Sequence, residues 1–284
     1  MRTLLLSCFS ALLLMACNGS QEPSAEQTSA SAASSEVAVT APADVAPEAP
    51  PACELNVGWN PYEPYQYADP DGNVRGLDLD LVSALAKQAG CSVRFTQDEW
   101  SKLLKGVQTG NIDVLTGATQ TTERDKYAHF SKPYRDETFV LFVRNGESEK
   151  WLAESIEEMV RDKKMRIGLV DGYVYGDEVD DLLGNADYVK LFISAPFSES
   201  HAANLLDNKI DGLLEDPFVG AAMVKRKVLG ERLTKLNFIL NRGQVSLMFS
   251  KASVTQERVA TFDSAIDAIK ANGEFDAIMK RYRK

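Results

Sequence analysis

The chain has 284 residues and a net charge of −10, with 31 lysines and arginines against 41 aspartates and glutamates. An acidic surface argues against binding to nucleic acid, whose phosphates favour basic patches. Only two histidines are present, and no spacing of cysteine and histidine fits a zinc site. We therefore expect neither a metal nor a cofactor.

The first residues predict export. Residues 1–16 combine Arg2 with an apolar run that is too short to span a bilayer, which is typical of a signal peptide. The end of this run, Leu14-Met15-Ala16-Cys17, resembles a bacterial lipobox, in which signal removal leaves the cysteine as the lipid-modified first residue. We expect membrane anchoring through Cys17. The alternative is an ordinary signal cleaved nearby, with Cys17 incidental.

Residues 17–52 are expected to be the lipidated cysteine and a disordered tether. After Cys17 the segment is Ser, Ala, Pro, Glu, Thr and Val without a period and contains no basic residue. Such a segment cannot bury enough apolar surface to offset its ordering entropy. The folded part is expected to begin at Cys53, and its length fits one large domain or two small lobes.

Two cysteines of the folded part stand just before apolar runs. Cys53 precedes a strand-like segment, and Cys91 precedes another. If these strands are parallel neighbours, the cysteines start at the same edge of a sheet. We predict a disulfide between them, as expected in an oxidising compartment. The alternative is two buried free thiols.

Strands and helices alternate along the folded part, which predicts a parallel sheet with helices on its faces. Gly90, Gly110 and Gly273 are predicted to end helices, with Asp78 or Asp80 capping the first helix. The predicted strands are Leu55–Trp59, Val93–Thr96, Ile112–Leu115, Phe139–Val143, Arg166–Val170, Tyr188–Phe192, Ile210–Leu214 and Val245–Phe249. Predicted helices include Trp100–Gln108, Ser155–Lys163, Val179–Leu183 and Ser200–Leu206.

An internal echo predicts two similar halves. The segment Gln108–Leu115 matches Leu206–Leu213, with Gly110 aligned to Asn208 and Asp113 aligned to Asp211. In each half a helix stops, a strand runs, and a polar loop opens at the carboxyl end of the strand, which is where open α/β sheets bind ligands. Asp113 and Asp211 are interpreted as turn acids that begin strands.

Two polar segments are candidate crossings between the halves, Arg144–Lys150 and Asn241–Gly243. A return of the C-terminus to the first half would make that half discontinuous. The predicted domains are therefore a first lobe of residues 53–143 plus 244–284 and a second lobe of residues 144–243.

The polar stretch Gly117–Tyr134 follows a buried strand and has no core of its own to bury. Four threonines and Arg124 lie within the nine residues 116–124. Hydroxyls, backbone amides and a guanidinium fork can surround a small anion with convergent donors. This stretch is the first candidate binding loop.

Five motifs, in order along residues 55–284, resemble the family 3 extracellular solute-binding proteins of bacteria, which are polar amino acid receptors of ABC importers. The motifs are Gly76–Leu81, Gly110–Asp113, Thr121–Arg124, Phe130–Tyr134 and Ile210–Asp211 with Asp216 downstream. The resemblance implies an α/β, two-lobed periplasmic-binding-protein fold of type II, with the ligand cleft between lobes joined by two hinge strands. It also implies a periplasmic, monomeric protein that passes an amino acid to a permease in the inner membrane.

The resemblance also implies roles for individual residues. Arg124 would bind the ligand α-carboxylate, aided by Thr119, Gly117 and backbone amides at Tyr173 and Val174. Asp216 would take the α-ammonium, and Tyr62 and Trp100 would flank the ligand side chain. The structural alternatives are a surface helix for Arg124, a turn acid before Pro217 for Asp216, and core packing for Tyr62 and Trp100.

Two positions depart from the family pattern. The second-lobe loop has Tyr173 where a small hydroxyl residue usually follows the glycine, so a side-chain donor is lost. Members that bind basic amino acids often place an acid near the end of the first strand, where this chain has Trp59. This departure weakens the reading as a receptor for lysine or arginine.

A binding protein without catalytic activity is the favoured interpretation. One alternative is an enzyme of the same fold, resembling cyclohexadienyl or arogenate dehydratases, with Glu215 or Glu63 recruited as a general acid. Another is a sensory or scaffolding lipoprotein without a role in transport.

Overall fold

The structure, a computed structural model, describes residues 53–226 and 229–282. The predicted signal peptide, the lipidated Cys17 and the tether fall on residues 1–52, outside the described part, and stay predictions. Within the described ranges no helix is both long enough and apolar enough to cross a membrane.

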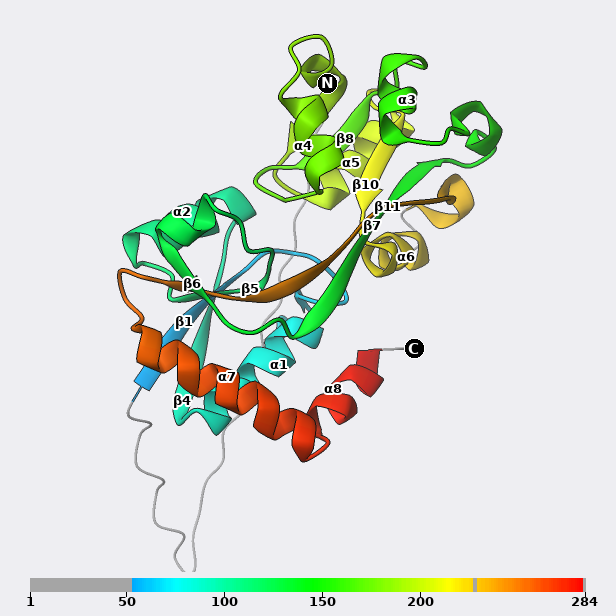
Figure 1. The fold of residues 1–284 in the computed structure, drawn as a ribbon. Helices are drawn as coiled ribbons and strands as arrows, with labels where there is room; N and C mark the ends of the chain where they lie inside the picture. Colours follow the sequence, from blue (N-terminus) through cyan, green and yellow to red (C-terminus); the bar gives the residue numbers. More distant parts are fainter. Residues whose placement is uncertain (1–52, 227–228, 283–284) are drawn as a thin grey trace, which may run out of the picture. The chain divides into compact units, whose positions relative to one another are not determined.

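The first group of strands is parallel, as the alternating pattern predicts. β1 pairs with β4 on one side and with β5 on the other. Helices α1, α7 and α8 pack on one face of this group, and α2 packs on the opposite face (Figure 1). The bounds are β1 Cys53–Trp59, α1 Leu77–Gln88, β4 Cys91–Gln97, α2 Trp100–Thr109, β5 Val114–Ala118, α7 Gln256–Ala271 and α8 Glu274–Tyr282.

The second group repeats this arrangement. β8 pairs in parallel with both β9 and β10. Apolar side chains of α5 and α6 cover one face, while those of α3 and α4 cover the other. The bounds are α3 Ile156–Arg161, β8 Ile167–Val170, α4 Asp177–Leu183, β9 Phe192–Ala195, α5 Ser198–Leu206, β10 Gly212–Glu215 and α6 Pro217–Lys225.

Two long antiparallel strands join the groups. β7 (Arg135–Arg144) and β11 (Leu233–Ser250) pair with each other, β11 also pairs with β5, and β7 also pairs with β10. The sheet order is β4-β1-β5-β11-β7-β10-β8-β9, with β6 (Ala128–Phe130) paired to β11. The predicted strand Val245–Phe249 is thus the end of an 18-residue strand. The division into a first lobe of residues 53–143 plus 244–284 and a second lobe of residues 144–243 remains a prediction.

Short elements complete the described chain. They are the hairpin β2 Tyr67–Ala68 and β3 Val74–Arg75, and the 3-10 helices Arg124–Lys126, Ser148–Trp151, Val189–Leu191 and Gly230–Arg232.

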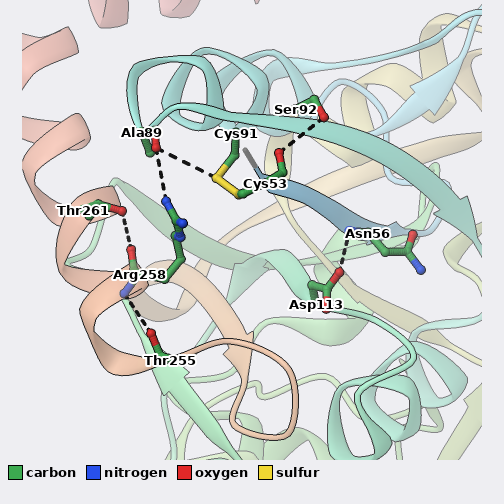
Figure 2. Close-up of a disulfide and its surroundings, with 9 residues drawn as sticks. All are labelled: Cys53, Asn56, Ala89, Cys91, Ser92, Asp113, Thr255, Arg258 and Thr261. Atoms are coloured by element: carbon green, nitrogen blue, oxygen red, sulfur yellow. Dashed lines mark hydrogen bonds between the residues drawn. A yellow bond between two sulfur atoms is a disulfide. The ribbon is translucent and has the colours of Figure 1, made fainter. Parts of the chain in front are cut away.

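The predicted disulfide is present. β1 and β4 are parallel neighbours in a register that sets Cys53 opposite Cys91, and the two residues are bonded with their Cα atoms 4.6 Å apart (Figure 2). The sulfurs lie beside the end of α1, where Arg258 of α7 donates to the carbonyl of Ala89. The bond therefore ties the first described residue into the sheet.

The echo between the halves is a structural repeat. The carboxylate of Asp113 accepts from the backbone N–H of Asn56 at 2.7 Å, and its own N–H donates to the Asn56 carbonyl at 2.9 Å. Asp211 makes the same pair with Arg166, at 3.1 and 2.7 Å. Gly110 and Asn208 both have positive φ. Each acid therefore clips the start of one strand to its parallel neighbour, which confirms the interpretation as turn acids.

Two local predictions are wrong. Tyr188–Phe192 is not a strand, because a 3-10 turn at Val189–Leu191 delays β9 to Phe192–Ala195. Asp78 and Asp80 do not cap α1, whose cap position is Gly76; Asp78 instead pairs with an arginine inside the molecule.

Helix α6 was not expected at all. It begins at Pro217, directly after Asp216, whose side chain accepts from two backbone N–H groups of its first turn. Proline at the first position after an Asp cap is a helix-start signal, and the apolar segment behind it supplies the buried face.

Candidate functional site

A central cavity lies where residues of both groups of strands meet. Its walls come from the carboxyl ends of β1 and β5, the start of α2, the loop after β8, and the first half of β7. The cavity has a volume of about 30 Å³, which is room for very few water molecules. It is lined by Asn60, Tyr62, Gln66, Trp100, Thr116, Gly117, Thr119, Arg124, Arg135, Glu137, Phe139, Tyr173 and Val174. Seven of the eight predicted ligand-binding residues are among them.

Arg124 is buried, with 6% of its surface exposed, so it is not a surface helix residue. Its Nη1 donates to the carbonyl of Thr119 at 2.6 Å, and its Nη2 donates to the carbonyl of Gly172 at 2.8 Å. Burial lowers the pKa of the guanidinium from its usual value, although an arginine remains charged. The result is a fixed cation whose fork faces the cavity between two segments far apart in the sequence.

Thr119 and Gly117 both line the cavity, and both also have structural contacts. Thr119 contributes a backbone carbonyl that orients Arg124. Gly117 has a φ of +67°, and a Cβ there would come within 3.0 Å of Arg135 Nη2 and 3.1 Å of an oxygen of Asp78. The glycine is therefore required by neighbouring protein atoms as well as by the backbone conformation.

Tyr62 and Trp100 face each other across a third aromatic ring. Tyr173 meets Tyr62 edge-on at 5.7 Å between ring centroids and meets Trp100 edge-on at 5.8 Å. Both Tyr62 and Trp100 are buried and pack into hydrophobic clusters, so they have structural contacts in addition to their place in the cavity wall. Val174 follows Tyr173 in the same loop and also lines the cavity.

A buried ion pair includes one residue of the cavity wall, Arg135. Arg135 donates through Nε and Nη2 to the two carboxylate oxygens of Asp78, each at 2.8 Å, with both side chains under 5% exposed. Burial opposes the charge of Arg135, but Asp78 outweighs it and holds the pKa of the guanidinium well above its usual value. The guanidinium also lies over the ring of Tyr65, 4.0 Å from its centroid. Sequence reasoning missed this pair because its members lie on separate elements.

Glu137 is a second acid that sequence reasoning missed. It stands on β7, lines the cavity, and lies 3.8 Å from Arg135 Nη1. Burial raises the pKa of its carboxyl to about 7, with Arg135 opposing the shift. The charged run at the start of β7, just before an apolar strand, was the available signal. The other lining residues that were missed are Asn60, Gln66, Thr116, Arg135 and Phe139.

Asp216 is the one predicted ligand-binding residue that is not in the cavity wall. Its Oδ1 accepts from the backbone N–H groups of Phe218 and Val219, at 2.8 and 3.2 Å, and its Oδ2 accepts from the Tyr65 hydroxyl at 3.2 Å. It is 1% exposed, and burial raises the pKa of its carboxyl. The geometry is that of a helix cap, whereas the structural alternative was a turn acid before Pro217.

The two acids that an enzyme would recruit lie outside the cavity wall. Glu215 is 1% exposed and its pKa is raised to about 8 by burial. Glu63 forms an ion pair with Arg226. Among residues 53–226 and 229–282, no three His, Cys, Asp or Glu side chains gather into a group that could hold a metal ion.

Two strand groups built alike, joined by two long strands and enclosing a polar cavity at the carboxyl ends of their parallel strands, define a two-lobed periplasmic-binding-protein fold of type II. An ancestral arginine-binding protein, in a structure with bound arginine, has the same fold: the TM-score is 0.70 at 23% identity, over 81% of this chain and 98% of the other. This likeness shows the fold alone.

The family model of the bacterial extracellular solute-binding proteins, family 3, matches residues 55–284. The chain belongs to this family. It is 27% identical to a probable histidine-binding protein of Neisseria gonorrhoeae over 243 residues, which is 84% of this chain and 85% of that protein. It is 25% identical to an L-arginine-binding protein of Pseudomonas aeruginosa over 237 residues, 78% and 84% of the two chains.

Proposed function

We propose that this solute-binding protein is a lipid-anchored periplasmic receptor that binds a free amino acid between its lobes. The receptor would be a monomer, and it would then deliver that amino acid to a permease of an ABC importer. The relatives named for binding histidine or arginine support an amino acid as ligand. The main observation in support is that Arg124, a buried arginine in a polar loop, lines the cavity with its guanidinium held in place.

The carboxylate of the ligand would bind Arg124. A guanidinium can meet a carboxylate with two parallel hydrogen bonds, and the carbonyls of Thr119 and Gly172 already hold it in place. A carboxylate is a stronger acceptor than the Gly172 carbonyl, so a ligand would compete for that bond. No covalent chemistry is required, in keeping with a receptor.

The α-ammonium has two candidate partners. Asp216 is the one that the family resemblance implies, while Glu137 is the acid in the cavity wall. Asp216→Asn keeps the side-chain oxygen that caps α6 but removes the charge, and Glu137→Gln does the same in the cavity. The variant that weakens binding identifies the partner.

Isothermal titration calorimetry with the twenty amino acids tests the proposal. Arg124→Lys keeps the charge but loses the fork, so we expect affinity to fall about 10- to 100-fold, the equivalent of one charge-assisted hydrogen bond. Arg161→Lys, a matched change at an exposed arginine, should leave affinity unchanged. Binding of no amino acid, or unchanged binding in Arg124→Lys, would overturn the proposal.

A further inference from the structure

The loop after β8 places a large side chain in the middle of the candidate site. Gly172 has a φ of +77°, and its carbonyl accepts from Arg124 Nη2 at 2.8 Å and from Trp100 Nε1 at 3.1 Å. Two donors from the first group of strands therefore fix the backbone at the residue before Tyr173. The side chain of Tyr173 is held in turn by Asn60, whose Nδ2 donates to its hydroxyl at 3.0 Å.

The ring of Tyr173 fills the space between Tyr62 and Trp100. It is nearly perpendicular to both rings, with interplanar angles of 87° and 82°. Edge-to-face pairs at these centroid distances are favourable aromatic contacts. Tyr173 also packs against all three hydrophobic clusters of the described chain. Its position is therefore well determined by packing from both groups of strands.

The space that Tyr173 fills is the space that an amino acid side chain would need. Under the proposed function the ligand backbone is held near Arg124, with Tyr62 and Trp100 beside its side chain. The cavity that remains is about 30 Å³, well below the roughly 300 Å³ or more of typical ligand pockets. A long ligand side chain and the Tyr173 ring cannot occupy this place together.

We propose that the Tyr173 side chain sets an upper size limit on the ligand, so that this receptor favours amino acids with short side chains. The inference rests on the proposed function. It gives the Tyr173 side chain a role in ligand selection, in addition to the role of the Tyr173 backbone amide as a donor to the ligand carboxylate. A long side chain must expel the ring and break its bond to Asn60 and both aromatic contacts. The loss of three such contacts corresponds to affinity at least ~10-fold lower for long side chains than for short ones.

Two variants separate the ring from the hydroxyl. Tyr173→Ala removes the ring and opens the space between Tyr62 and Trp100. Tyr173→Phe removes only the bond to Asn60 and keeps the ring in place, so it is the matched control. Tyr173→Val, with intermediate volume, serves if the alanine variant does not fold, as judged by circular dichroism and the unfolding temperature without ligand.

The measurement is calorimetric affinity of the full-length protein and its variants for glycine, alanine and serine against glutamine, histidine and arginine. We expect the protein to prefer the short set. Tyr173→Ala, or Tyr173→Val, should gain at least ~10-fold for one or more of the long set relative to the short set, while Tyr173→Phe keeps the original order.

Each other outcome has a definite meaning. If the protein binds an amino acid but prefers the long set, or if the order does not change in the alanine and valine variants, the size limit is wrong and the proposed function stands. If neither the protein nor any variant binds an amino acid, the proposed function fails, and the inference fails with it.

Discussion

At the scale of single residues, the site combines fixed cations with acids whose protonation depends on burial. Arg124 and Arg135 are both buried and both oriented by at least two acceptors. Glu137 lines the same cavity, and its carboxyl has a pKa of about 7 because it is removed from water. The charge of the cavity wall therefore changes in the neutral range of pH.

Glu137 makes stability depend on pH, and the sign follows from its pKa. The carboxyl titrates near about 4.3 in an unfolded chain and at about 7 in the folded protein. The folded state thus holds the proton more tightly, and stability is lost as pH rises through the folded pKa. Glu137→Gln cannot ionise, so its loss of stability between pH 5 and pH 8 should be smaller by about 2–3 kcal/mol.

Urea unfolding at the two pH values measures this difference. Glu215 has a pKa of about 8 for the same reason. It is unchanged in the variant, so some dependence of stability on pH remains there. An equal loss of stability in the protein and in Glu137→Gln would show that Glu137 is not the titrating group.

At the scale of elements, the sequence patterns located most helices and strands and the disulfide between β1 and β4, but not the buried ion pairs between elements. Gly110 and Asn208 ended helices as predicted, because both adopt the left-handed conformation. Asp113 and Asp211 were recognised from the echo. By contrast, the pair of Arg135 and Asp78 joins β7 to α1, and a spacing of 57 residues carries no local signal.

Site residues that stand in local sequence motifs were predicted, and those outside such motifs were missed. Arg124 and Trp100 stand in local motifs, and both lie in the cavity wall. Glu137 lies in a strand whose apolar half alone was recognised, so the polar half that reaches the cavity was overlooked. Asp216 was assigned from the family pattern, whereas its local sequence, an acid before Pro217, describes the helix cap that the structure shows.

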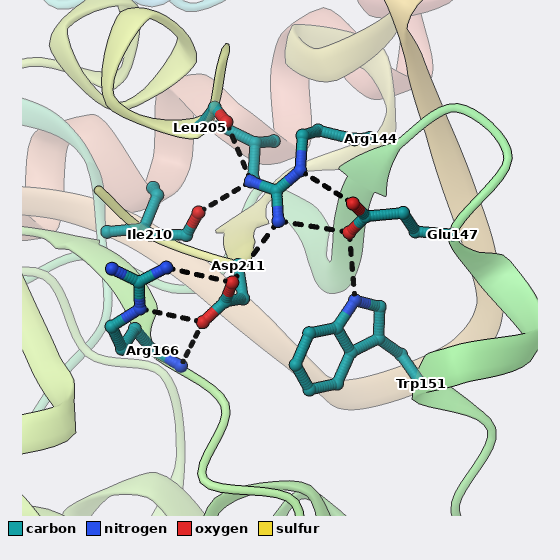
Figure 3. A network of polar contacts seen from close by, with 7 residues as sticks. All are labelled: Arg144, Glu147, Trp151, Arg166, Leu205, Ile210 and Asp211. Carbon is teal, nitrogen blue, oxygen red and sulfur yellow. Dashed lines mark hydrogen bonds and ion pairs between the residues drawn. The ribbon is translucent and has the colours of Figure 1, made fainter. Parts of the chain in front are cut away.

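The second half shows how a predicted turn acid becomes part of a larger network. Asp211 accepts from Arg166 Nε at 2.8 Å and from Arg144 Nη2 at 3.2 Å, and Arg144 also binds Glu147 and the carbonyls of Leu205 and Ile210 (Figure 3). Burial alone would raise the pKa of Asp211, but these arginines lower it. The network ties the end of β7 to the turn between α5 and β10.

The disulfide gives a prediction about the attachment of β1. It closes a loop with a sequence separation of 38 between Cys53 and Cys91. By the loop-entropy model such a crosslink stabilises by roughly 3–4 kcal/mol. The double variant Cys53→Ser/Cys91→Ser should lose about that much, measured by urea unfolding, and dithiothreitol should lower the stability of the unaltered protein to the same level.

A control separates the crosslink from the packing of the sulfurs. The double variant has no disulfide for dithiothreitol to reduce, so dithiothreitol should not change the stability of this variant further. If the unaltered protein is as stable in dithiothreitol as without it, the bond contributes nothing to stability.

At the scale of the whole described molecule, β7 and β11 are the continuous links between the two groups, and side-chain contacts also join the groups. These include Arg124 with the Gly172 carbonyl, Asn60 with Tyr173, and Tyr65 with Asp216. Under the proposed function, in which the lobes close around the ligand, such contacts would form on closure and would not contribute to the folding of either lobe alone.

The ion pair of Glu63 and Arg226 is a further contact between the two groups. Glu63 lies in the loop after β1, Arg226 ends α6, and the two side chains are 31% and 42% exposed. A pair this exposed is worth only about 0.2–1 kcal/mol, because water and salt screen it. It should therefore adjust the closing equilibrium without being required for it.

A double-mutant cycle on ligand binding measures this contribution. Under the proposed function, Glu63→Ala and Arg226→Ala should each weaken amino acid binding by less than about fivefold, since closure loses one screened pair. The double variant should be no worse than the weaker single variant, which gives a coupling energy of about 0.2–1 kcal/mol that falls as salt is raised. Arg226 also lies 3.5 Å from Glu199 in its own lobe, and Glu199→Ala is the control that should leave binding unchanged. Additive effects of the two single variants would show that the pair does not couple the lobes.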